Sequence, residues 1–297
     1  MDIPSKDRPR VVGIGEILWD IFPDRSCFGG APANFAAHAS NLGCDSAMVS
    51  SVGSDELGEK ALRELATRGI DCSFVARSER PTGTVKVALD DEGKADYVFA
   101  ADTAWDALKW SPRLESLARE TQAVCFGSLG QRAARSCGTI QRFVAGTRED
   151  CLRIFDVNLR QNFYNDDVLD DSLFLANVLK LNDEEIDVVD PTGIESPPVE
   201  RLQNLCRKYN LRLAALTLGA KGALLATPDS FAEATTGRVD VVDTVGAGDA
   251  FTATTALGML RGASLEDIGT RACEIAAFVC SQPGATPELP PTLRTPF

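Results

Sequence analysis

The sequence has only one histidine, His38, among its 297 residues. Zinc sites and Ser–His–Asp triads use histidine as a metal ligand or as the general base, so we exclude both kinds of site. His38 itself lies in an alanine-rich, helix-like segment, and we interpret it as a structural residue. The nine cysteines form no CxxC pair and are odd in number, which argues against a disulfide framework. We therefore expect reduced, mostly buried thiols and a cytoplasmic protein.

Long apolar runs and an apolar leader are absent as well. No stretch approaches the ~18 consecutive apolar residues of a membrane-spanning helix, and the N-terminal segment MDIPSKDRPR is polar. Acidic residues outnumber basic ones by 43 to 30, which gives a net charge of −13 at pH 7. A negative surface repels nucleic acid and anionic membranes. We therefore expect a soluble protein that binds neither.

Two common phosphate-binding motifs are missing. The P-loop pattern GxxxxGK[ST] occurs nowhere in the chain. The sequence Gly246-Ala247-Gly248 is followed by Phe251 at the position where a dinucleotide fingerprint has glycine. These absences exclude a P-loop nucleotide site and a Rossmann-type dehydrogenase.

The most informative stretch that is present runs from Val239 to Leu260. The β-branched run Val239–Val242 predicts a buried strand, and the apolar residues from Ala250 onward predict a helix. A glycine-rich turn between a strand and a helix forms an anion site, because the first helical N–H groups have no partner. Asp249 lies at the mouth of this site. Its carboxylate would either cap the helix or act as a general base beneath a transferring phosphoryl group.

The rest of the chain predicts an α/β fold. Strands and helices alternate from residue 123 onward, which predicts a doubly wound, mainly parallel sheet with helices on both faces. Active residues of such folds lie at the carboxyl ends of the strands. The expected strands are 10–16, 47–53, 123–126, 153–157, 178–181, 213–218 and 222–226. The expected helices are 35–42, 55–68, 131–147, 166–176, 183–188, 198–209 and 250–260.

A change of pattern predicts a small β-sheet lid on this single domain of residues 1–297. Residues 84–89 alternate between apolar and polar side chains, and after a turn at 90–93 the apolar pattern returns at 97–99. We expect the lid to form from about residues 16–30 and 83–101. A small sheet alone leaves unpaired edges, so we expect two lids to pair in a homodimer that buries Trp19 or its apolar neighbours.

Polar residues near the N-terminus indicate a site for a polyol. Asp20 interrupts an apolar run, where an acid is costly to bury without a partner; alternatively, it is an outward-facing strand residue. Gly29 and Gly30 leave backbone groups exposed, and Asn34 offers both a donor and an acceptor.

Five segments resemble, in the expected order, the signatures of the ribokinase/PfkB-type carbohydrate kinases, and the first two are most similar to the fructokinase branch. The segments are GEILWD (15–20), GGAPANFA (29–36), DVNLR (156–160), NDEE (182–185) and DTVGAGD (243–249). The resemblance extends from residue 13 to 284. It implies a ribokinase-like fold and an ATP-dependent kinase that phosphorylates a primary hydroxyl of a sugar, with fructose the favoured substrate.

The resemblance also implies roles for individual residues. Asp249 would be the general base, and the N–H groups of Gly246, Ala247 and Gly248 would stabilise the transferring phosphoryl group. The residues implied to hold the sugar are Asp20, Gly30, Asn34 and Arg160. Those implied to lie along the nucleotide are Asn182, Thr217, Gly219 and Gly222. Glu185 would hold Mg²⁺ through water, and Asp243, with the Val245 carbonyl and the loop 281–286, would hold a monovalent cation such as K⁺.

Alternatives stay open at this point. Ribose, 2-keto-3-deoxygluconate or a nucleoside could replace fructose, and a non-catalytic sugar sensor could keep the same fold. Arg160 could lie on the surface, and the acidic residues at 183–185 could merely begin a helix. A chain this negative also repels ATP, so Mg²⁺ and local cations such as Lys180 and Arg160 would have to reverse the charge inside the cleft.

Overall fold

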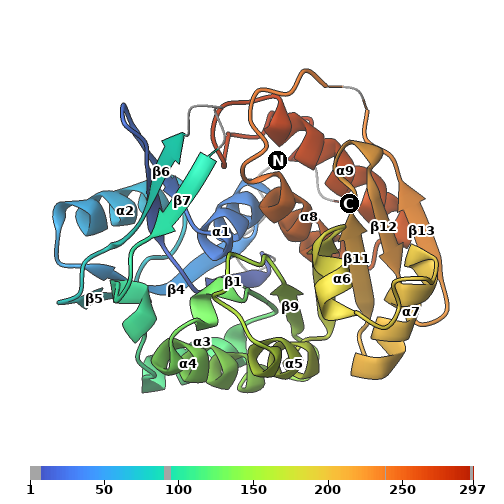
Figure 1. The fold of residues 1–297 in the computed structure, drawn as a ribbon, viewed down its shortest axis with the longest axis horizontal. Coiled ribbons are helices and arrows are strands. Elements are labelled where there is room, and N and C mark those ends of the chain that lie inside the picture. Colours follow the sequence, from blue (N-terminus) through green and yellow to red (C-terminus); the bar gives the residue numbers. More distant parts are fainter. Residues whose placement is uncertain (1–7, 90–94, 238, 295–296) are drawn as a thin grey trace.

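A nine-stranded sheet runs through the computed structural model, which describes residues 8–89, 95–237, 239–294 and 297 (Figure 1). The strands lie in the order β13-β12-β11-β10-β9-β8-β1-β4-β5. Those from β5 to β11 pair in parallel, and β12 and β13 add an antiparallel edge. Their bounds are β1 (Arg10–Ile14), β4 (Asp45–Gly53), β5 (Val75–Ser78), β8 (Ala123–Phe126), β9 (Leu152–Asp156), β10 (Val178–Asn182), β11 (Leu213–Thr217), β12 (Ala223–Ala226) and β13 (Phe231–Ala234).

Helices cover both faces of this sheet, which confirms the doubly wound fold. One face packs against α1 (Ala31–Asn41), α8 (Ala247–Arg261) and α9 (Leu265–Cys280). The other face packs against α3 (Pro112–Glu120), α4 (Ala134–Ala145), α5 (Asp166–Leu175) and α7 (Pro198–Tyr209). The remaining helices are α2 (Glu56–Thr67) and α6 (Glu185–Val189), with single turns η2 (Ala104–Ala107), η3 (Leu129–Gln131) and η4 (Gly219–Lys221). Within the described part of the chain, no helix combines the length and apolarity that a membrane crossing needs.

The strand order reverses between β1 and β8. From β1 the chain moves outward to β4 and β5, then returns to β8 and builds the other half of the sheet. Ligands of such sheets bind at the carboxyl ends of the strands beside this reversal, where the loops that leave β1 and β8 lie. The two loops approach closely, because a Cβ atom placed on Gly130 would lie 3.0 Å from the Cα atom of Gly15.

A second, four-stranded sheet stands apart from the main one, in the order β3-β2-β6-β7 (Figure 1). Its strands are β2 (Leu18–Ile21), β3 (Ser26–Gly29), β6 (Gly83–Leu89) and β7 (Ala95–Phe99). Antiparallel pairs β2–β3 and β6–β7 are joined by a parallel β2–β6 pair. Val85 and Val87 are buried while Lys86 is exposed, as the alternation predicts. The predicted turn at 90–93 lies outside the described residues.

Trp19 faces the main body of its own chain. Its indole Nε1 donates to the Leu57 carbonyl at 3.1 Å, and its ring packs with residues of α1 and α2 in one apolar cluster. Its edge contact with Phe28 fixes β3 beside β2. The side chain that we expected in a lid interface is therefore already buried in the monomer.

The predicted strand at Val239–Val242 is wrong. These residues form no strand, and the exposed fractions of Val239, Val241 and Val242 are 39%, 63% and 63%. The backbone N–H groups of Val242 and Asp243 instead donate to the Cys280 carbonyl at 2.8 and 3.2 Å, at the end of α9. The segment is thus held by a helix end, and Val239 and Val241 line a cleft instead of packing in the core.

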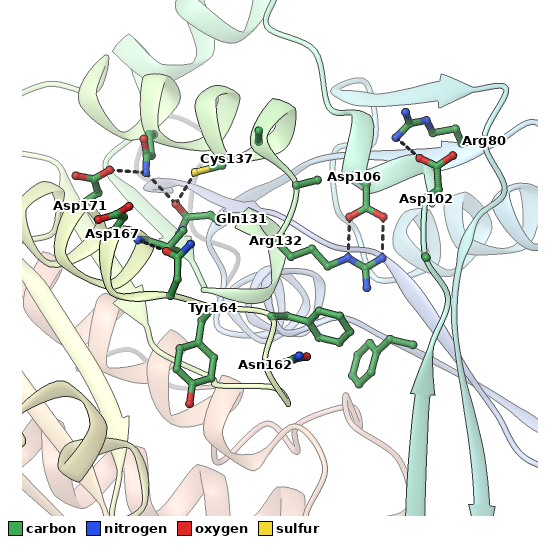
Figure 2. Close-up of a pocket in the computed structure, with 18 residues that line it drawn as sticks. Arg80, Asp102, Asp106, Gln131, Arg132, Cys137, Asn162, Tyr164, Asp167 and Asp171 are labelled. Carbon is green, nitrogen blue, oxygen red and sulfur yellow. Dashed lines mark hydrogen bonds and ion pairs between the residues drawn. The ribbon is translucent and has the colours of Figure 1, made fainter.

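A buried ion pair fixes the chain that leaves the small sheet. Arg132 donates to both carboxylate oxygens of Asp106 at 2.8 and 2.7 Å, and its guanidinium lies 4.0 Å from the centre of the Trp105 ring. Both charged side chains are almost completely buried. Figure 2 shows the pair at the edge of a groove of about 630 Å³ between α4, α5 and the segment after β7. A second pair, Arg80–Asp102, lies on the same groove but is largely exposed.

The contrast between these two pairs gives a stability prediction. Arg132→Met should lower the free energy of unfolding by about 3–5 kcal/mol, because it leaves the Asp106 carboxylate buried without a counter-charge. The matched control, Arg80→Met, should lower it by less than about 1 kcal/mol, because water already screens that pair. Urea unfolding followed by circular dichroism measures both values. Equal losses in the two variants would contradict this account of the Arg132–Asp106 pair.

Candidate active site

The first turns of α1 and α8 meet above the carboxyl ends of the central strands. Asn34 in α1 donates through Nδ2 to Oδ2 of Asp249 in α8 at 2.8 Å. Gly30 precedes α1 with φ of 119°, and a Cβ atom there would lie 2.5 Å from the Glu16 carbonyl oxygen. Glycine is therefore required at this position. The tight turn at Gly30 places Asn34 in the first turn of α1, where it reaches Asp249.

The glycine-rich turn before α8 leaves its helix terminus open. Gly246 has φ of 82°, and within the described part of the chain no side chain caps this helix. The Asp243 carboxylate accepts from the Val245 N–H at 3.0 Å and the Gly284 N–H at 3.2 Å, which shapes the turn from below. An uncapped N-terminus with the positive end of the helix dipole suits an anion. The structure therefore forms the anion turn without the strand that we expected to precede it.

Lys180 lies beneath this turn. Its Nζ donates to Asp156 Oδ1 at 3.0 Å, and a Cβ atom placed on Gly248 would lie 3.1 Å from the same Nζ. Thr252 in α8 donates to the other Asp156 oxygen at 2.8 Å. Burial lowers the pKa of Lys180, but the carboxylates of Asp156 and Glu185 raise it more, so the ammonium stays charged. The sequence indicated Lys180 only as a local cation; the structure places its charge under the anion turn.

Asp249 and Glu16 have clearly raised pKa values. Burial, together with the Asp156 carboxylate, raises the pKa of Asp249 to about 6, against the hydrogen bond from Asn34 and the charge of Lys180. Burial also raises the pKa of Glu16 to about 7. The Oε2 atom of Glu16 is buried and has no hydrogen-bond partner among the described residues. Sequence reasoning missed Glu16, although its position in GEILWD, between a glycine and an apolar run, was a usable signal.

The predicted sugar residues gather around Asp249. Asp20 on β2 is half-buried, and burial raises its pKa while the charge of Arg160 lowers it. Arg160 follows β9, is exposed, and its charge also lowers the pKa of Glu16 and Asp249. The guanidinium thus lies within electrostatic reach of all three acids. Asp20, Asn34 and Arg160 come from three separate elements and converge on one region.

The loop that carries Arg160 touches the small sheet. Gln161 donates through Nε2 to the Tyr97 carbonyl at 2.6 Å. The rings of Phe163 and Phe99 meet edge to face, with their centres 5.4 Å apart. Contact of this loop with β7 encloses the region around Asp20 and Asp249 between the small sheet and the main sheet.

The four predicted nucleotide residues line one cleft of about 790 Å³: Asn182, Thr217, Gly219 and Gly222. Ala247 and Gly248 of the anion turn line the same cleft. Gly222 has φ of 100°, and a Cβ atom there would lie 1.9 Å from the Ala234 carbonyl oxygen, so glycine is required. The cleft therefore leads from the turn at η4 directly to the first turn of α8.

The predicted magnesium residues are already hydrogen-bonded within the protein. Glu185 accepts from the Leu159 N–H at 3.0 Å and the Asn182 N–H at 2.9 Å. The Asn182 side chain accepts from the N–H groups of Glu184 and Glu185. Among the described residues, no group of three or more His, Cys, Asp or Glu is arranged to hold a metal. Because the side-chain oxygens of Glu185 and Asn182 already accept these hydrogen bonds, they fit a hydrated Mg²⁺ contacted through water better than a directly bound ion.

Comparison with known proteins agrees with this arrangement. Residues 25–292 match the profile of the pfkB family carbohydrate kinases. The chain belongs to this family. A fructokinase of Salmonella typhimurium is 30% identical over 253 residues, which cover 81% of each chain.

Two solved carbohydrate kinases share the fold of this one. The crystal structure of an uncharacterised sugar kinase from Pyrococcus horikoshii is 28% identical, has a TM-score of 0.79 and covers 93% of both chains. The fructokinase of Vibrio cholerae O395, crystallised with fructose, ADP and calcium, is 27% identical, has a TM-score of 0.78, and aligns over 95% of this chain and 96% of its own. A double mutant of that fructokinase was crystallised with fructose, ADP and a potassium ion.

The raised pKa of Asp249 gives a prediction about this carbohydrate kinase. Asp249→Asn keeps the size of the side chain but removes its basicity, so kcat should fall by ~10²–10⁴. In the wild type, kcat/KM should fall as the pH drops below about 6, because protonation removes the base. At pH 8, kcat/KM should no longer depend on the protonation of Asp249. Near-normal turnover in a folded Asp249→Asn protein would show that Asp249 is not the general base.

Proposed function

We propose that this protein is an ATP-dependent fructokinase that transfers the γ-phosphoryl group of ATP to a primary hydroxyl of fructose, giving fructose 6-phosphate. The observation that carries the proposal is the position of the Asp249 carboxylate. It is bonded to Asn34 beside the uncapped start of α8, at the end of the cleft that reaches Gly248. A sugar hydroxyl at Asp249 and a phosphate at Gly248 would then face each other.

The chemistry follows from this placement. Asp249 takes the proton of the sugar hydroxyl as its oxygen bonds to the γ-phosphorus, and the bond from phosphorus to ADP breaks. The N–H groups of Gly246, Ala247 and Gly248 stabilise the charge on the transferring group. The ammonium of Lys180 below Gly248 adds positive charge. Mg²⁺, reached through water from Glu185, would neutralise nucleotide phosphates, and a monovalent cation at Asp243 would support the turn.

Charge around Asp249 favours a neutral sugar. Three acids, Glu16, Asp20 and Asp249, share the region with two cations: Arg160 acts on all three acids, and Lys180 acts on Asp249. A sugar acid such as 2-keto-3-deoxygluconate would meet like charges there. Fructose is preferred over ribose or a nucleoside because GEILWD and GGAPANFA resemble the fructokinase branch. The intact Asp249 and its glycine-rich turn argue against a non-catalytic sugar sensor.

A sugar panel tests the substrate. We expect kcat/KM for fructose to exceed that for ribose, 2-keto-3-deoxygluconate and adenosine under identical Mg-ATP. An analogue that lacks a particular hydroxyl leaves the polar groups that bond it unpaired, which can lower kcat/KM by ~10⁴ or more. Asp20→Ala should lower kcat/KM for fructose while leaving the KM for ATP nearly unchanged. A higher kcat/KM for ribose or the keto-acid than for fructose would contradict the fructokinase assignment. No turnover with any sugar would favour the non-catalytic sugar sensor.

We also propose a cytoplasmic homodimer that pairs through the small sheet, which then acts as a lid. Tyr97 and Val98 on β7 are exposed apolar side chains, and β7 is an edge strand of the small sheet, open to pairing with another strand. Light scattering should show a dimer, and Val98→Lys should shift it towards monomer, because a charge on an edge opposes pairing. Thr84→Lys, placed on β6 inside the sheet, is the comparison. A wild-type monomer at every concentration would contradict this assembly.

A further inference from the structure

His38 makes one specific contact in a fully buried position. It lies one helical turn after Asn34 on α1, and its Nε2 is 3.0 Å from the carbonyl oxygen of Ala285. A carbonyl oxygen only accepts, so Nε2 must carry the proton and Nδ1 must be bare. Burial lowers the pKa of His38 to about 4, which keeps the ring neutral. The ring is therefore a fixed N–H donor aimed at one peptide group.

Packing alone does not explain a histidine at this position. Its Nδ1 is buried without a hydrogen-bond partner among the described residues. A buried acceptor left unpaired destabilises the fold, whereas an apolar ring of similar size would avoid that cost. The hydrogen bond to Ala285 is thus what distinguishes histidine from phenylalanine here.

The Ala285 carbonyl that His38 holds is packed against the anion turn. A Cβ atom placed on Gly246 would lie 2.0 Å from the Ala285 oxygen and 2.7 Å from its carbonyl carbon. Gly246 is the residue from which α8 begins, with φ of 82°. Any rotation of the Ala285 peptide would therefore change the space in which Gly246 adopts this conformation.

Other hydrogen bonds hold the loop around Ala285 at different points. Gly284 donates to Asp243, Arg68 donates to the Thr286 hydroxyl at 3.0 Å, and Asn41 donates to the Pro287 carbonyl at 3.3 Å. The His38 bond differs from these because its acceptor is the carbonyl that touches Gly246. Like the Asn41 bond, it starts from α1, the helix that carries Asn34.

We propose that His38 is a positioning residue that holds the Ala285 carbonyl against Gly246, so that α1 and the anion turn of α8 shift together. This inference rests on the proposed function, in which Asn34 contacts the sugar and the Gly246–Gly248 turn contacts the transferring phosphoryl group. Sugar binding that fixes α1 then also fixes Gly246. Sugar and nucleotide should therefore strengthen each other's binding by the same factor.

Three variants test the coupling. His38→Phe keeps the ring and removes the donor, and His38→Gln restores an N–H near the position of Nε2. Asn41→Ala, the matched control, removes the bond from α1 to Pro287 but leaves Ala285 held. Calorimetry measures the Kd of ADP with and without saturating fructose, and steady-state kinetics give kcat and KM for each variant.

In the wild type, fructose should tighten ADP binding. One hydrogen bond corresponds to a factor of about 2–12, so His38→Phe should reduce the coupling and kcat by that amount, with the Kd of fructose in the absence of nucleotide nearly unchanged. His38→Gln should recover most of both, and Asn41→Ala should match the wild type. If His38→Phe does not fold, His38→Met, with a flexible apolar side chain, takes its place.

Wild-type coupling and kcat in a folded His38→Phe or His38→Met protein would overturn the proposal, whatever the loss of thermal stability. So would an equal loss of coupling in Asn41→Ala, because the whole loop and not the Ala285 carbonyl would then matter. A wild type in which fructose binds without tightening ADP also overturns it. Failure of the proposed function looks different, because no sugar of the panel would then bind or turn over.

Discussion

The hydrogen bond between Asn34 and Asp249 is the constraint on which the rest of the site depends. It joins two helix starts that are 215 residues apart in sequence. Each start needs a glycine in the left-handed region, Gly30 before α1 and Gly246 before α8. Burial of the Asp249 carboxylate raises its pKa, and the charge of Lys180, which is paired with Asp156, limits this rise. The site thus depends on the balance of charges around Asp249 as well as on the geometry of the two helix starts.

Much of the fold could be predicted because its signals are local. The strands at 123–126 and 213–217 follow from apolar runs, and the site follows from them because parallel strands end at one edge. Val239–Val242 was misread because an apolar β-branched run looks the same whether it faces the core or a cleft. The hydrogen bond of His38 could not be predicted because its partner, Ala285, lies 247 residues away. Long-range contacts of this kind leave no periodic signal in the sequence.

The segment from 182 to 185 shows a second limit of motif reading. Asn182 and Glu185 were predicted to act on nucleotide and magnesium, yet both side chains bond backbone N–H groups. Glu185 connects the loop after β9, through Leu159, to the start of α6. This loop also carries Arg160, so Glu185 fixes the position of the loop whose guanidinium acts on Asp20 and Asp249. A motif can therefore combine a structural and a chemical requirement in one side chain.

The exposed valines along the cleft have a thermodynamic consequence. Val239 and Val241 line the cleft while much of each side chain remains in water. A nucleotide base packed against them would remove apolar surface from solvent, and such burial carries a negative heat-capacity change. The enthalpy of nucleotide binding would then become more favourable as temperature rises. The affinity of this kinase for its phosphoryl donor would accordingly follow a curved, and not a linear, van 't Hoff plot.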